Sequence, residues 1–126
     1  MVGLEVRENK MGLDQYMYVA SGTNSNDSDR RDLGYRRKHP NLHGWMRRLW
    51  ESKGNEGEFN GDELELTWED LENLERAVTH KQLPSTDGFF FGSDSDDHYR
   101  EQDLVFVRNA KAEIFTGLKV FYNSSW

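Results

Sequence analysis

The residues from Gly34 to Trp45 (GYRRKHPNLHGW) offer the clearest chemistry in the sequence. They include Tyr35, Arg36, Lys38, Asn41 and His43, placed just before and inside the first turn of a predicted helix. The N-terminus of a helix offers free N–H groups and a partial positive charge, and guanidinium groups can bind phosphate or carboxylate through two hydrogen bonds. The pattern predicts an anion-binding site, in which His43 is a weaker candidate for a general acid or base.

A purely structural interpretation of the same block stays open. Asn41 would then cap the helix, His43 would be a hydrogen-bonded, half-buried histidine, and the arginines would form a solvated face. A triad of His43 and Asp14 with Ser124 or Ser125 is disfavoured, because no G-x-S-x-G turn is present and both serines lie in the last three residues. We expect these serines to act as hydrogen-bond donors.

Metal and cofactor sites are not predicted. An acidic run (Asp94, Asp96, Asp97, Glu101 and Asp103) lacks the glycine and the alternation of a calcium loop, so a solvated helix N-terminus explains it better. The chain has no cysteine, which excludes disulfides, thiolate zinc sites and cysteine nucleophiles. No glycine-rich nucleotide loop occurs.

The charge of the chain is unevenly distributed. Residues 30–53 hold eight Lys or Arg against two acids, a net charge of +6. The rest of the chain has a net charge of −13, so the chain as a whole has −7. A basic stripe on an acidic body suits a small anion or a partner surface, and it disfavours duplex nucleic acid, because the acidic remainder would repel a long polyanion. The alternative is that the two parts neutralise one another across the fold.

Periodicity predicts the elements that must position these side chains. Residues 12–20 alternate like a strand, residues 21–32 are rich in Ser, Asn and Asp and predict a loop, and Pro40–Lys53 predicts a helix. Residues 63–67 predict a short strand, and Thr67 with Asp70 forms the pattern of a capping box that opens a second helix. Its expected buried stripe is Leu71, Leu74, Ala77 and Val78.

The remaining elements are an aromatic strand at residues 88–92 (GFFFG), a helix at 99–116 and a last strand at 118–122. The resulting β-α-β-α-β-α-β order predicts an α+β fold with about three helices on one face of a small mixed sheet of about four strands. At 126 residues the chain fits one domain, with residues 1–10 as a frayed extension. No apolar run approaches the roughly 18 residues of a membrane span, so a cytosolic location is the default expectation.

Four segments together resemble a family of small, mostly uncharacterised proteins found chiefly in bacteriophages: GLDQY, YRRKHPNLHGW, LPSTDGFFFG and FYNSSW. The similarity covers residues 11–126, with one extra residue before Lys38 relative to the family pattern. The matching residues are mostly polar or aromatic and include Asp14, Tyr16, Lys38, Asn41, His43, Trp45, Gly92, Tyr122, Ser124, Ser125 and Trp126. The resemblance implies a phage-encoded accessory protein in the cytoplasm of an infected bacterium, without implying a particular activity.

These observations predict a binding module for a small anion, such as a nucleotide or a phosphorylated metabolite, or for a host or defence protein. Arg36 and Lys38 would neutralise the anion, Asn41, His43 and Ser125 would orient it, and Tyr16, Tyr35 or Trp126 would stack on it. This requires the tail of the last strand to lie beside the start of the first helix. The alternatives are a small hydrolase or transferase that uses His43, and an acidic interaction protein that docks a basic partner through residues 56–103.

Overall fold

The computed structural model describes residues 12–20, 30–84 and 95–126. In chain order the elements are β1 (Asp14–Ala20), β2 (Arg31–Arg37), α2 (Pro40–Ser52), β3 (Glu63–Leu66), α3 (Trp68–Thr79), α4 (Ser95–Phe115) and β4 (Lys119–Ser125). The α+β class and the three helices agree with the sequence prediction, and β1, β3 and β4 correspond to predicted strands. The predicted extension at 1–10 and the predicted strand at 88–92 lie outside the described residues.

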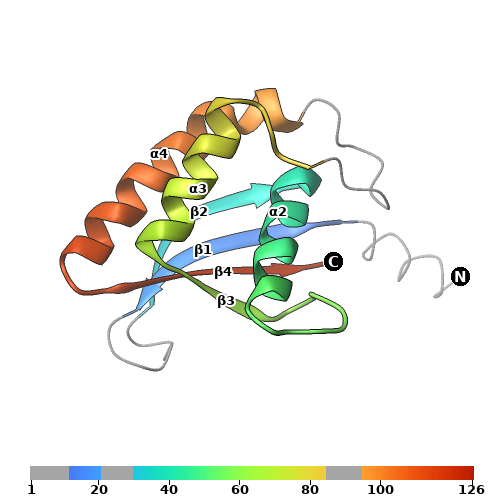
Figure 1. Ribbon diagram of the computed structural model, residues 1–126, viewed down its shortest axis with the longest axis horizontal. Helices are drawn as coiled ribbons and strands as arrows, with labels where there is room; N and C mark the ends of the chain where they lie inside the picture. Colours follow the sequence, from blue (N-terminus) through green and yellow to red (C-terminus); the bar gives the residue numbers. More distant parts are fainter. Residues whose placement is uncertain (1–11, 21–29, 85–94) are drawn as a thin grey trace, which may run out of the picture.

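The four strands form one sheet in the order β2-β1-β4-β3, and the helices lie on one side of it (Figure 1). Each of the three strand pairs is antiparallel, where a mixed sheet was expected. In the register of the central pair, Asp14 of β1 stands opposite Ser125 of β4. The beginning of the first strand and the end of the last strand therefore meet at one end of the sheet.

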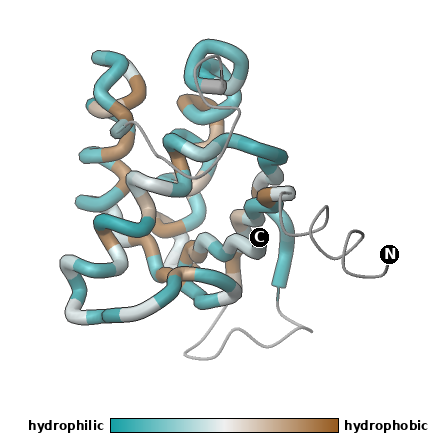
Figure 2. Tube along the Cα trace, turned by 90° about the vertical axis from the view of Figure 1, so that its right-hand side faces the viewer, coloured by the Kyte–Doolittle hydropathy of each residue, from teal (hydrophilic) through white to brown (hydrophobic). Residues whose placement is uncertain are grey.

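The main core lies between this sheet and the helices. From the sheet, alternate residues such as Met17, Val19 and Tyr122 face the helix layer. Each helix adds an apolar stripe: Leu42, Met46 and Trp50 from α2, Leu71, Leu74 and Val78 from α3, and Phe106, Val107 and Ala110 from α4. Figure 2 shows apolar (brown) and polar (teal) residues intermixed along the helical turns. Burial of each large apolar side chain contributes about 1.5–3 kcal/mol to folding.

The start of α3 confirms the predicted capping box. The Thr67 hydroxyl accepts a hydrogen bond from the Asp70 N–H at 3.1 Å, and the Asp70 carboxylate accepts one from the Thr67 N–H at 2.9 Å. Two N–H groups that a helix start would leave unsatisfied thus find partners. The predicted stripe of Leu71, Leu74, Ala77 and Val78 is buried.

Strand β2 differs from the sequence prediction, which places a loop at residues 21–32 and the approach of the helix after it. It pairs with β1 through residues such as Tyr35, opposite Tyr16, and the register shifts once, between Met17 and Tyr18. A Cβ at Gly34 would lie 3.1 Å from the Met17 Cε, so glycine lets this edge strand approach the core closely. None of the described helices is both long and apolar enough to span a membrane.

Candidate functional site

The end of β4 lies beside the start of α2, as the sequence predicted. The Ser124 Oγ is 3.0 Å and the Tyr122 hydroxyl 3.4 Å from Nδ1 of His43. The ring of Trp126 meets the His43 ring edge-on, with centroids 6.1 Å apart. Two segments that are distant in sequence, the start of α2 and the end of β4, therefore meet at one histidine.

We call the contact between the start of α2 and the end of β4 the His43 junction. His43 lies in its interior and not in an open recess. It is only 3% exposed, and its ring stacks on Phe59 with centroids 5.4 Å apart. Burial, with a smaller contribution from the nearby Arg47, lowers the pKa of His43 to about 4. A neutral imidazole at pH 7 can accept a hydrogen bond from the Ser124 hydroxyl, so this geometry stabilises the fold without exposing the ring to a ligand.

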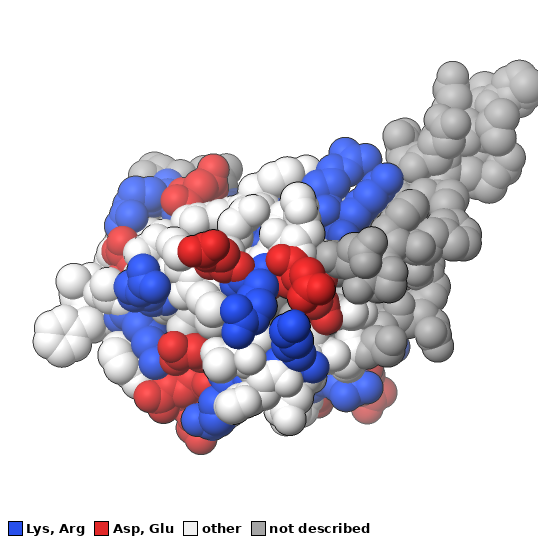
Figure 3. Space-filling view, turned by 90° about the horizontal axis from the view of Figure 1, so that it is seen from above, with Lys and Arg blue, Asp and Glu red and all other residues white. Residues whose placement is uncertain are grey.

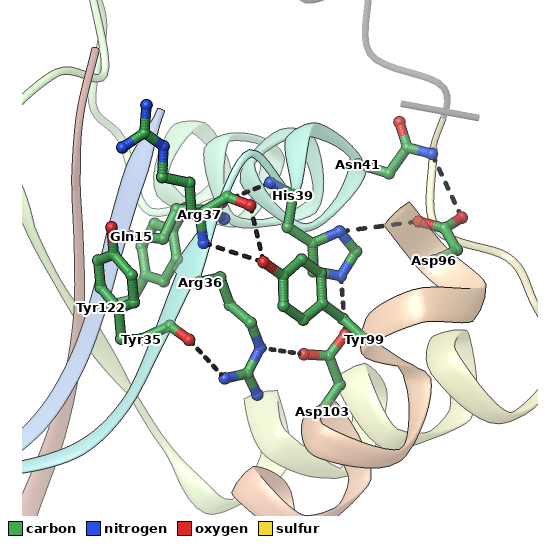
Figure 4. A network of polar contacts seen from close by, with 10 residues as sticks. All are labelled: Gln15, Tyr35, Arg36, Arg37, His39, Asn41, Asp96, Tyr99, Asp103 and Tyr122. Carbon is green, nitrogen blue, oxygen red and sulfur yellow. Dashed lines mark hydrogen bonds and ion pairs between the residues drawn. The ribbon is translucent and has the colours of Figure 1, made fainter. Parts of the chain in front are cut away.

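A buried ionic network, which the sequence did not predict, lies next to His43. Asp103 of α4 accepts a hydrogen bond from Nε of Arg36 at 2.8 Å, and its other oxygen is 2.8 Å from Nε2 of His39 (Figure 4). Arg36, His39 and Asp103 are 3%, 0% and 1% exposed. The charge of Arg36, which was expected to neutralise a ligand, is therefore matched by a carboxylate of the chain itself.

Gln15 links this network to the His43 junction. Its Oε1 accepts a hydrogen bond from the His39 N–H at 3.0 Å, and its Nε2 donates one to the Tyr122 hydroxyl at 2.9 Å. Gln15 is fully buried, so both ends of its amide are satisfied inside the protein. Gln15 follows the same alternation as the apolar residues of β1 that face the core, and this pattern in the sequence could have indicated a buried glutamine.

A second internal carboxylate lies at the N-terminus of α2, where an external anion was expected. Asn41 donates from Nδ2 to the Asp96 Oδ2 at 3.2 Å, and Nδ1 of His39 is 3.9 Å from the Asp96 Oδ1. Asn41 lies in the first turn of α2, and the N-cap residue is His39. The solvated-cluster interpretation of the acidic run is wrong for Asp103, which is buried, and Asp96 contacts α2. Among the described residues, no group of three or more possible ligands is placed to hold a metal ion.

Tyr99 of α4 closes the end of β2. Its hydroxyl donates to the Arg37 carbonyl at 2.7 Å and accepts from the Arg37 N–H at 3.2 Å (Figure 4). Its ring stacks on His39 with centroids 4.9 Å apart, and the Arg36 guanidinium lies 5.5 Å from the ring centre. Tyr99 thus holds together the helix, the strand end and the buried network.

Four other residues share the opposite face of the sheet, which no described helix covers. Tyr16 and Tyr35 stand opposite one another on β1 and β2, 42% and 46% exposed, with ring centroids 5.3 Å apart. The Tyr35 hydroxyl donates to the Asp14 carboxylate at 2.6 Å, which raises the pKa of Tyr35. The Arg37 guanidinium lies 3.9 Å from the same carboxylate and is 55% exposed.

The remaining predicted residues are Lys38, Ser125 and Trp126. Lys38 follows β2 in a left-handed backbone conformation with φ of 59°, and its N–H donates to the Leu13 carbonyl at 2.8 Å. Ser125 is exposed at the end of β4. Trp126 is fixed to the turn before β3, because its indole N–H donates to the Phe59 carbonyl at 3.0 Å and its backbone N–H donates to the Asn60 side chain. The sequence therefore predicted one site, and the structure divides its residues between a buried junction and an exposed face.

The basic stripe is largely neutralised within the fold. Of its eight Lys and Arg residues, five contact carboxylates: Arg31 with Glu113, Arg36 with Asp103, Arg37 with Asp14, Arg47 with Glu51 and Lys53 with Asp70. On the face seen in Figure 3, basic and acidic groups are interspersed. The structure thus favours the interpretation in which the two parts of the chain neutralise one another.

Comparison with known proteins found no match among family models, curated proteins or solved structures.

Proposed function

We propose that this protein is a binding module that stacks a nucleotide on the open face of its sheet. The observation that carries the proposal is the pair formed by Tyr16 and Tyr35, two exposed aromatic rings side by side on adjacent strands. Every nucleobase has a flat face that can stack on an aromatic ring, and each such contact contributes about 1–3 kcal/mol to binding.

The tyrosine pair is held in place before any ligand arrives. Both residues lie on paired strands, and the Tyr35 hydroxyl is fixed by Asp14. A side chain that is already ordered loses little conformational freedom on binding, so more of the stacking free energy appears as affinity. The expected role of Asp14 is therefore to orient Tyr35, while Tyr16 and Tyr35 contact the base.

Positive charge is available at the same end of the sheet. Arg37 is more than half exposed, and its 3.9 Å contact with Asp14 is longer than a hydrogen bond. A phosphate group could therefore engage the Arg37 guanidinium, with Lys38 next to it in the chain. The net charge of −7 favours a mononucleotide or a short single strand over a long polyanion.

A small groove of about 330 Å³ lies next to Tyr35, between β2 and α4. Gln102 and Asn109 of α4 line it, and their amides could contact a part of the ligand that extends past the edge of the sheet. His43 has no part in this proposal, because it is buried and its pKa is lowered. If the chain acts in an infected bacterium, as the bacteriophage resemblance implies, the ligand would come from the host nucleotide pool.

Isothermal titration with AMP, UMP and the matching nucleosides tests the proposal. We expect the Tyr16→Ala/Tyr35→Ala variant to lose at least tenfold in affinity for both kinds of ligand, whereas Arg37→Gln should weaken nucleotides and leave nucleosides unchanged. Phe115→Ala is the control, since Phe115 is 86% exposed at the end of α4, in the helix layer. Equal binding by the tyrosine variant and wild type, or no binding by wild type, would overturn the proposal.

A further inference from the structure

A separate groove, with a volume of about 530 Å³, lies in the helix layer between α2 and α3. Its apolar part is formed by Trp45, Leu49 and Ala77, and its polar rim includes Arg48, Arg76 and His80. Small-molecule sites commonly have volumes of about 300–1,000 Å³, an apolar lining and a few polar groups that converge. None of these residues belongs to the open sheet face, so the groove is independent of the proposed nucleotide site.

The cationic residues of this groove have no carboxylate partner among the described residues. Within residues 12–20, 30–84 and 95–126, no ion pair or hydrogen bond joins Arg48 or His80 to another side chain, and Arg76 is joined only to the neutral amide of Asn73. Arg47, the neighbour of Arg48 on the same helix, instead pairs with Glu51. Two guanidinium groups that share a groove without an acid form a local positive potential, even in an acidic chain.

We propose that this groove binds a small organic anion, one that joins a phosphate or carboxylate group to an aromatic or aliphatic body. The guanidinium groups of Arg48 and Arg76 would bind the anionic group, because their planar N–H donors match two oxygens at once. Trp45 and Leu49 would contact the body of the ligand. An inorganic ion alone would make only the first set of contacts and should bind more weakly.

The placement of the groove on two helices favours a preformed site. The apolar faces of α2 and α3 are anchored in the core by residues such as Met46 and Leu74, both fully buried. Side chains that project from such rigid elements keep their relative positions better than side chains on loops. The Asn73 side chain in addition holds the Arg76 guanidinium.

NMR titration of the full chain tests the proposal, with the indole N–H signal of Trp45 as the readout. The probes are phenyl phosphate, benzoate, inorganic phosphate and the neutral benzyl alcohol. We expect saturable shifts of the Trp45 signal with phenyl phosphate and with benzoate, and at least fivefold weaker binding of the other two probes. The two anions separate a preference for phosphate from one for carboxylate.

Matched variants identify the groups that bind. Arg48→Gln and Arg76→Gln should each weaken phenyl phosphate binding at least fivefold, whereas Arg47→Gln should change it less than twofold, because Arg47 pairs with Glu51 and does not line the groove. All three side chains are exposed, so the variants should keep the wild-type spectrum elsewhere. The proposal fails if no anion shifts Trp45 saturably, if benzyl alcohol binds equally well, or if Arg47→Gln has the same effect as Arg48→Gln.

Discussion

At the scale of single residues, His43 shows how burial changes what a histidine can do. The sequence allowed both an anion ligand or acid–base group and a satisfied structural histidine. In the structure its Nδ1 faces the hydroxyls of Ser124 and Tyr122, and its ring lies against Phe59. These neighbours can donate hydrogen bonds to a neutral ring, but none offers a negative charge to a protonated one.

A pH-dependent stability follows from His43. The pKa of His43 is about 4 in the folded protein, whereas the ordinary pKa of a histidine, which applies in the unfolded chain, is 6.5. Between these values the unfolded chain binds a proton that the native chain does not, so the free energy of unfolding falls as the pH drops from about 7 to 4. From pH 8 to pH 5 we expect His43 to account for a loss of about 2 kcal/mol, measurable by urea unfolding at both pH values.

The comparison that isolates this effect is the His43→Gln variant, because other titrating groups contribute to both proteins. Between pH 8 and pH 5 the free energy of unfolding of the variant should fall by about 2 kcal/mol less than that of wild type. Equal losses would contradict the assignment. If the variant does not fold, the ring proton signals of His43 in wild type provide the check, since they should not titrate between pH 8 and pH 5.

At the scale of elements, the start of α3 could be predicted because its determinants are local. Thr67 and Asp70 are three residues apart, and their side chains satisfy each other's backbone N–H groups. Strand β2 could not be predicted, because it is an edge strand with arginines at both ends and without a clear apolar face. Charged side chains on an edge strand hinder pairing with other chains, and they also hide the strand from a search for apolar alternation.

Removal of the cap at Thr67 should destabilise the protein measurably. In Thr67→Ala the Asp70 N–H loses its side-chain acceptor, which should lower the free energy of unfolding by about 1 kcal/mol. Thr67→Ser keeps the hydroxyl and should lie within about 0.5 kcal/mol of wild type. Chemical denaturation of the three proteins measures both differences, and an alanine variant as stable as the serine variant would contradict the prediction.

At the scale of the whole molecule, the meeting of the first strand with the end of the last strand was predictable. The chemistry at that place was predictable only in part. Residues near Asp14 and Ser125 were expected at one place, and the antiparallel register puts them there. The burial of Arg36 and His39 was missed, because their partner Asp103 lies 67 and 64 residues away in the sequence. A local pattern shows that an arginine can bind an anion, but it does not show whether the anion comes from a ligand or from the chain.

Asp103 joins three parts of the fold, since it lies on α4 and contacts Arg36 of β2 and His39 at the start of α2. In Asp103→Ala a guanidinium only 4% exposed would lose its countercharge, so we expect the free energy of unfolding to fall by about 3–5 kcal/mol. Glu113→Ala, which breaks the more exposed pair with Arg31, should cost less than about 1 kcal/mol.

A third variant separates the buried charge from the lost packing. In Arg36→Met/Asp103→Leu both charges are replaced by apolar groups of similar volume, so no guanidinium is left unpaired in the interior. We therefore expect this double variant to be more stable than Asp103→Ala in urea or thermal unfolding, although it carries one more substitution. If Asp103→Ala proved as mild as Glu113→Ala, Arg36 would have to reach water in the folded protein, and its positive charge would again be available to a ligand.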